Sequence, residues 1–205
     1  MTKMRLGLSL LGAGLALGLT FASSAMAADP TEACAGCHGA DGVSTDPHVP
    51  TIAGLSAAYL TSTMKAYADK QRPCAEATVA SGAKKGSKTD MCAVAKETSA
   101  ADVAALSAAY AGKKFVAAKQ TADAALAAKG KDLHDKLCDK CHTEKGSVAE
   151  DDAGLLAGQW MPYLAAQLND YKSGKRPVPT KMQPKLDQVQ VGDIDALVNY
   201  YGAGK

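Results

Sequence analysis

The chain contains the pattern Cys-x-x-Cys-His twice, and the sequence around it is duplicated. A shift of 104 residues superposes the first copy, 34–38, on the second, 138–142, and the match continues without a gap for about 40 residues. Nearer the end of each half the shift becomes 91, so the first half carries 13 extra residues between Pro73 and Met91. The duplication predicts two domains of one fold, each built around one copy of the pattern.

Hydrophobic periodicity predicts that each half is helical. Apolar side chains recur at helical spacing over 59–67 and 163–171, and again over 103–110 and 194–201. Only Val-Gln-Val at 189–191 resembles a strand. We expect an all-α fold, with a first domain at 28–111, a connector at 112–128 and a second domain at 129–205.

The first 27 residues have the layout of a secretory signal peptide. Lys3 and Arg5 precede an apolar run at 6–21, and Ala-Met-Ala at 25–27 resembles a cleavage site. An uncleaved membrane anchor is the alternative, but this run of about 16 residues is shorter than the roughly 20 that span a bilayer. We therefore expect cleavage after residue 27, export to the periplasm, and a mature chain without a membrane span.

Charge and composition narrow the class of protein further. Loss of the signal peptide removes two basic residues and leaves 21 of each sign. A net charge near zero disfavours nucleic-acid binding, which requires a basic surface. The whole chain has only two Phe and one Trp, so each half has a small apolar core. Cores of this size need further buried contacts, and a large apolar cofactor in each half would provide them.

The cysteine pattern indicates which cofactor this is. Cys-x-x-Cys-His is typical of covalent haem c attachment, in which each thiol adds to a vinyl group and the histidine binds iron. Zinc would need a fourth ligand in each half, and none recurs. Thioredoxin-like redox chemistry would need alternating strands and helices. We predict two covalently bound haem c groups, attached through Cys34, Cys37, Cys138 and Cys141, with His38 and His142 as proximal iron ligands.

Methionine sulfur is the usual sixth ligand of an electron-transfer haem that has a histidine ligand. Of the four methionines after residue 27, the repeat preserves only Met91 and Met182. Met64 and Met161 have no methionine partner, and Met64 suits a role as core filler. We predict Met91 and Met182 as distal ligands. With methionine as the sixth ligand of both irons, neither iron has an open coordination position for a substrate such as peroxide. This disfavours a dihaem peroxidase.

Other titratable side chains have open roles. His48 and His134 are rival ligands, but neither has a counterpart in the other half, and we expect them to be solvated or locally bonded. Arg72 and Arg176 do repeat. Their guanidinium groups could pair with haem propionates, and a plain surface role is the alternative.

The extra segment of the first half includes Cys74, and Cys92 directly follows its end. In an exported protein these thiols are expected to form a disulfide that closes the extra loop beside the first haem, the alternative being free or intermolecular thiols. Lys84, Lys85 and Lys88 lie in the same loop and either steer a partner or form a solvated face.

Taken together, these motifs resemble the dihaem cytochrome c4 family over essentially the whole mature chain, which implies two tandem class I cytochrome c-like domains. More narrowly, 117–142 and 155–171 resemble the dihaem subunit of flavocytochrome c sulfide dehydrogenase. Gly154, which stands where cytochrome c4 usually has proline, suits that subunit, whereas Cys74 and Cys92 belong to neither pattern.

This narrower resemblance implies a one-electron relay that is not an enzyme by itself. It binds an FAD-containing sulfide dehydrogenase subunit and passes electrons to a downstream redox protein or oxidase. A freestanding cytochrome c4-type carrier is the alternative.

Overall fold

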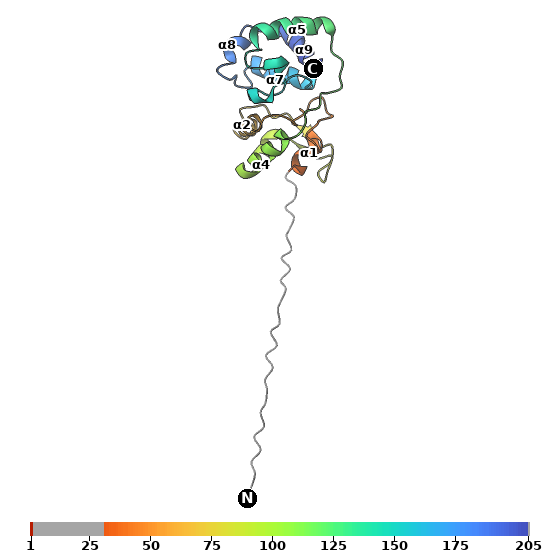
Figure 1. Ribbon diagram of the computed structural model, residues 1–205, viewed down its shortest axis with the longest axis vertical. Helices are drawn as coiled ribbons and strands as arrows, with labels where there is room; N and C mark the ends of the chain where they lie inside the picture. The colour runs from red at the N-terminus through yellow and green to blue at the C-terminus, as the bar shows by residue number, and fades with distance from the viewer. Residues whose placement is uncertain (2–30, 205) are drawn as a thin grey trace.

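The computed structural model describes residues 31–204, together with Met1, and places them in two helical domains, one above the other in Figure 1. This arrangement confirms the predicted all-α class with two tandem domains. The expected signal peptide lies outside the described residues. Within the part of the chain that is described, no helix is long and apolar enough to cross a membrane.

Side-chain caps begin two helices of the first domain. Ser56 Oγ accepts a hydrogen bond from the backbone N–H of Tyr59, and Ser99 accepts one from the backbone N–H of Asp102. These caps set the start of the two helices that the hydrophobic periodicity predicts. The helices of this domain are α1 (Glu32–His38), α2 (Ala57–Ala68), α3 (Met91–Glu97) and α4 (Ala100–Ala111).

In the second domain, α5 and α9 pack against each other. Their close approach depends on Gly130, because a Cβ there would collide with the Ala196 carbonyl and with Tyr200. The helices of this domain are α5 (Ala124–Leu137), α6 (Thr143–Gly146), α7 (Met161–Lys172), α8 (Gln183–Leu186) and α9 (Ile194–Gly202), with 3₁₀ turns η1 (Ala149–Asp151) and η2 (Val191–Asp193).

Each domain has its own apolar core, and the two cores meet. Leu155 comes from the second domain but packs into the core of the first. The buried side chains of the first core are Leu55, Leu60, Leu106, Tyr110 and Leu155. Those of the second are Leu164, Leu186, Val189, Ile194, Leu197, Val198 and Tyr201. Because Leu155 is shared, the domains are packed together and are not merely joined by a linker.

The connector lies against the second domain. Ala118 donates its backbone N–H to the Gly158 carbonyl at 2.8 Å, and Gln120 Nε2 donates to the Gln159 carbonyl at 2.7 Å. The Asp123 side chain caps α5, whose first turn occupies 124–128, the last part of the predicted connector. The domain boundary at residue 128 stays a prediction.

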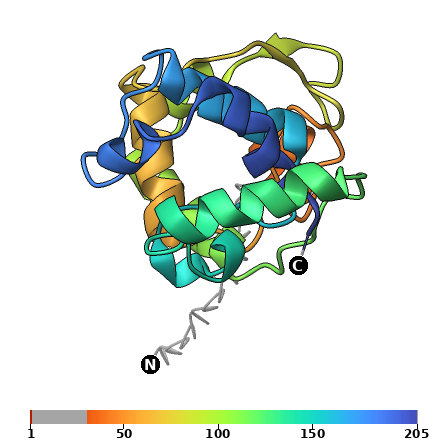
Figure 2. The ribbon, with the colours of Figure 1, turned by 90° about the horizontal axis from the view of Figure 1, so that it is seen from above.

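The segment that resembles a strand in the sequence does not form one, and two short strands occur elsewhere among the described residues. Val189 lies in a turn and Val191 begins η2, so 189–191 is not a strand. Strands instead occur in the extra segment, where β1 (Ala77–Thr78) pairs antiparallel with β2 (Lys88–Thr89). This hairpin lies at the edge of the molecule, yellow-green in Figure 2. Two-residue strands in an exposed, Lys- and Gly-rich segment show no alternating pattern that sequence reasoning could detect.

Candidate haem sites

One continuous cavity of about 1940 Å³ passes through both domains. Its lining includes both copies of the cysteine pattern and both predicted distal methionines. Met64 and its repeat counterpart Leu168 also line the cavity, so they occupy equivalent positions on its wall in the two halves. The predicted attachment and ligand residues on the lining are Cys34, Cys37, His38, Met91, Cys138, Cys141, His142 and Met182.

The four motif cysteines are not disulfide-bonded, as covalent attachment requires. Burial raises the pKa of the Cys34 and Cys138 thiols. Each of these thiols also has a hydrogen bond with a tyrosine from the last helix of its domain, Tyr110 of α4 for Cys34 and Tyr201 of α9 for Cys138. These hydrogen bonds lower the pKa of each thiol and partly offset the effect of burial. These tyrosines correspond in the repeat. The duplication therefore preserves the surroundings of the first cysteine as well as its spacing.

His38 is held by a hydrogen bond between its Nδ1 and the Pro50 carbonyl, at 2.8 Å. Because a carbonyl can only accept, Nδ1 carries the proton and Nε2 keeps the lone pair that a metal needs. Burial lowers the pKa of His38, with the Pro50 bond opposing it, so the ring is neutral near pH 7. His38 has the protonation state and the fixed orientation of an iron ligand.

His142 is half-buried, and its Nδ1 atom, which is buried, has no hydrogen-bond partner among the described residues. Burial, followed by nearby His134, lowers its pKa, so this ring is neutral too. Gly154 stands at the repeat position of Pro50 and has a left-handed backbone, with φ of 82°. A Cβ at Gly154 would meet the Tyr59 ring 2.8 Å away, so the domain interface requires glycine here.

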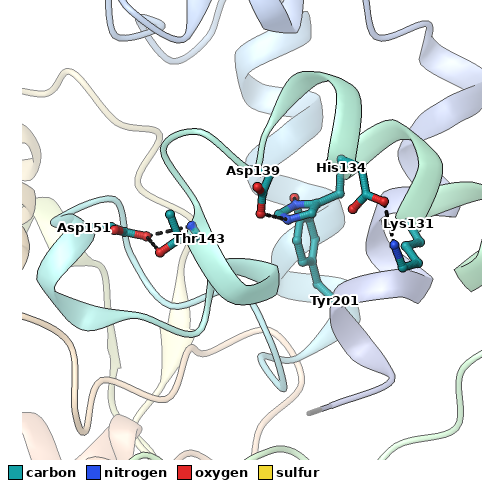
Figure 3. A network of polar contacts seen from close by, with 7 residues as sticks. Lys131, His134, Asp139, Thr143, Asp151 and Tyr201 are labelled. Atoms are coloured by element: carbon teal, nitrogen blue, oxygen red, sulfur yellow. Dashed lines mark hydrogen bonds and ion pairs between the residues drawn. The ribbon is translucent and has the colours of Figure 1, made fainter.

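The backbone after His142 is held by different contacts (Figure 3). Thr143 donates both its backbone N–H and its hydroxyl to Asp151 Oδ2, each at 2.7 Å. Glu144 and Lys145, which follow, have left-handed backbones. In the first half, Gly39 and Ala40 occupy the positions of Thr143 and Glu144. The two histidines are thus equivalent in sequence but are supported differently.

Of the two rival histidines, His134 has local hydrogen-bond partners that do not involve iron. His134 is buried, and its ring nitrogens contact the Tyr201 hydroxyl at 3.0 Å and Asp139 at 3.3 Å (Figure 3). This matches the expectation of local bonding and excludes solvation. His48 is exposed, on the rim of the cavity.

Arg72 lies at the domain interface, and a plain surface role for it is wrong. Its side chain is only 4% exposed and lies over the Tyr67 ring. It donates across the interface to Tyr163 Oη at 3.2 Å and to Gln167 Oε1 at 2.5 Å, and Arg176 donates to the same Gln167 oxygen at 2.8 Å. Both arginines line the cavity, so pairing with haem propionates stays a prediction.

The extra segment covers the first cysteine motif. Cys74 and Cys92 form a disulfide with a Cα–Cα distance of 5.7 Å, which confirms the predicted bond. Beyond β1, the backbone N–H groups of Ala80 and Ser81 both donate to the Gly36 carbonyl, between the two motif cysteines. The hairpin therefore packs on α1. Its lysines are exposed, and Lys88 pairs with Glu76.

The residues in both halves fit a covalently bound haem c. Each offers two thiols that are not disulfide-bonded, a neutral imidazole and a methionine around a largely apolar cavity. A haem iron held in this way cycles between ferric and ferrous states and so carries one electron.

Comparison with known proteins agrees with this geometry. The family model described as cytochrome c matches residues 27–109. Cytochrome c4 of Pseudomonas aeruginosa is 31% identical over 212 residues, which cover 98% of this chain and 96% of that protein. The chain belongs to the cytochrome c4 family. It is thus a c4-type dihaem cytochrome with two covalently bound haem c groups, and it carries electrons.

Other relatives of this c4-type cytochrome also match it over most of its length, and solved structures share its fold. Cytochrome c4 of Stutzerimonas stutzeri is 34% identical over 206 residues, covering 91% of this chain and 93% of that protein. The crystal structure of reduced cytochrome c4 from Pseudomonas stutzeri superposes with a TM-score of 0.68 at 26% identity, over 85% of this chain and 95% of that one. A thiosulfate dehydrogenase, TsdBA from Marichromatium purpuratum, superposes with a TM-score of 0.65 at 27% identity, over 82% of this chain and 36% of that one.

Proposed function

We propose that this c4-type cytochrome is the electron-accepting subunit of a sulfide-oxidising flavocytochrome in the periplasm. An FAD-containing sulfide dehydrogenase subunit is its electron donor, and a downstream redox protein or oxidase is its acceptor. Cys34 and Cys37 hold the first haem and Cys138 and Cys141 the second. The iron ligands are His38 with Met91 in the first domain and His142 with Met182 in the second.

The observation that carries the proposal is the single cavity shared by the two domains. Two one-electron centres in one continuous site can each take an electron from a two-electron donor without dissociation of the complex. Oxidation of sulfide at a flavin releases electrons in pairs, so a dihaem acceptor suits it. The resemblance of 117–142 and 155–171 to a flavocytochrome subunit and the glycine at 154 point to the same donor.

The protein isolated from its native periplasm at low salt tests this proposal. We expect a flavoprotein to co-elute at one flavin per two haems, and anaerobic sulfide to reduce both haems of the complex. The cytochrome separated from the flavoprotein is the matched control, and its haems should stay oxidised with sulfide. Thiosulfate in place of sulfide tests whether the electron donor is another sulfur compound.

A freestanding cytochrome c4-type carrier is the second candidate, because the match to two proteins named cytochrome c4 extends over nearly the whole chain. A flavin-free dihaem protein that sulfide does not reduce would favour this candidate and would refute the flavocytochrome assignment. A dihaem peroxidase would need an open distal position, which the two methionines would fill.

A further inference from the structure

Gln159 of the second domain binds the backbone of the first domain at Thr51. The Thr51 N–H donates to Gln159 Oε1 at 2.9 Å, and Gln159 Nε2 donates to the Thr51 carbonyl at 2.9 Å. Both residues are at most 2% exposed. A buried amide that pairs with both polar groups of one backbone residue fixes that backbone tightly.

The peptide group that Gln159 binds is the one that holds His38. The Thr51 N–H and the Pro50 carbonyl belong to a single planar peptide unit. The carbonyl accepts from His38 Nδ1 at 2.8 Å, while the N–H donates to Gln159 at 2.9 Å. Hydrogen bonds in such a chain polarise one another, so the bond to Gln159 makes the Pro50 carbonyl a stronger acceptor.

The second domain lacks this chain of hydrogen bonds. Leu55 stands at the repeat position of Gln159 and cannot form a hydrogen bond with its side chain. Leu155 and Gly154 replace Thr51 and Pro50, and His142 Nδ1 has no partner among the described residues. The two predicted proximal histidines, His38 and His142, therefore differ in the hydrogen bonding of Nδ1.

We propose that Gln159 is a positioning residue that lowers the reduction potential of the first haem relative to the second. It acts from the second domain through the Thr51–Pro50 peptide on His38. A stronger hydrogen bond at Nδ1 makes the imidazole a more basic ligand, and a more basic ligand stabilises ferric iron. This role goes beyond the proposed function, because it holds for any electron donor.

The test compares the holoprotein with its Gln159→Leu variant, which places the first-half residue in the second half. A redox titration followed by NMR of the haem methyl groups assigns a potential to each haem. The rate at which His38 Nδ1–H exchanges with D₂O is a second readout. We expect the potential of the first haem to rise and this exchange to accelerate, while the second haem keeps its potential.

Trp160→Phe is the matched interface control, because Trp160 Nε1 donates to the Ser44 carbonyl across the same interface at 3.0 Å. It should change neither readout. Equal shifts of both haems, no shift in Gln159→Leu, or the same shift in Trp160→Phe would each overturn the proposal. Gln159→Met, which keeps an unbranched side chain without the amide, answers the same question if the leucine variant does not fold.

Discussion

Removal of the disulfide between Cys74 and Cys92 is expected to destabilise the first domain by about 3 kcal/mol. The bond joins residues 18 apart, and the chain-entropy relation gives about 3 kcal/mol for a loop of this size. Apart from the contacts of residues 79–81 with α1, little else holds the loop, because residues 82–88 are exposed and the hairpin strands have two residues each. Two-stranded hairpins are marginal on their own in water.

The assay is guanidinium unfolding of the oxidised holoprotein carrying Cys74→Ser and Cys92→Ser together. Cys92 follows Met91 at the start of α3, so the variant should lose the Met91–iron bond at lower denaturant than wild type. The long-wavelength absorption band of methionine sulfur bound to ferric haem reports this loss.

Met182 provides the control, because the iron–sulfur bond proposed for it lies in the other domain. The part of the absorption band that belongs to this haem should persist to the same denaturant concentration as in wild type. An unchanged unfolding free energy would refute the reasoning. Equal destabilisation of the two domains would show that the loop supports the interface and not the first haem site alone.

Four further substitutions and one control test the ligands and the packing. Met91→Ala and Met182→Ala should each remove half of the methionine–iron absorption band, and unchanged spectra would contradict the ligand assignment. Gly130→Ala should lower the unfolding free energy by about 1–3 kcal/mol in a denaturant titration, because its Cβ overpacks α5 against α9. Gly192→Ala, whose Cβ meets no atom within 4 Å, is its control and should be near neutral. Gly154→Ala should cost about 1–2 kcal/mol from its left-handed backbone alone, and an unchanged midpoint would contradict that assignment.

Local patterns predicted the helices well and the extra segment poorly. The periodicity at 59–67 corresponds to α2, and that at 194–201 corresponds to α9. Such faces are readable because helix side chains three and four positions apart share a side. The β1–β2 hairpin was missed because its position depends on the disulfide and on contacts with the Gly36 carbonyl. Those contacts have no periodic signature.

The chemistry of the site could be predicted from the sequence, but the hydrogen bonds that hold its residues in place could not. Spacing alone predicted the cysteines and histidines as haem residues, and the repeat predicted Met91 and Met182; all of them line the cavity. The repeat could also have marked Arg72 as more than a surface residue, since Arg176 matches it. The sequence did not indicate a role for Gln159, because the repeat has Leu55 at the equivalent position. The hydrogen-bond partner of Gln159, Thr51, lies 108 residues away in the chain.

The haem chemistry and the two-domain plan can be read from local patterns, since both depend on residues close together in the chain or on a simple repeat. Thiols two residues apart, with a histidine beside them, are already at the spacing that haem attachment needs. The tertiary structure decided what distinguishes the two halves. It supports His38 through Pro50 and Gln159, leaves His142 Nδ1 without a partner among the described residues, and buries Arg72 between the domains. These contacts join residues far apart in the chain, and only packing of the two domains brings them within hydrogen-bond distance.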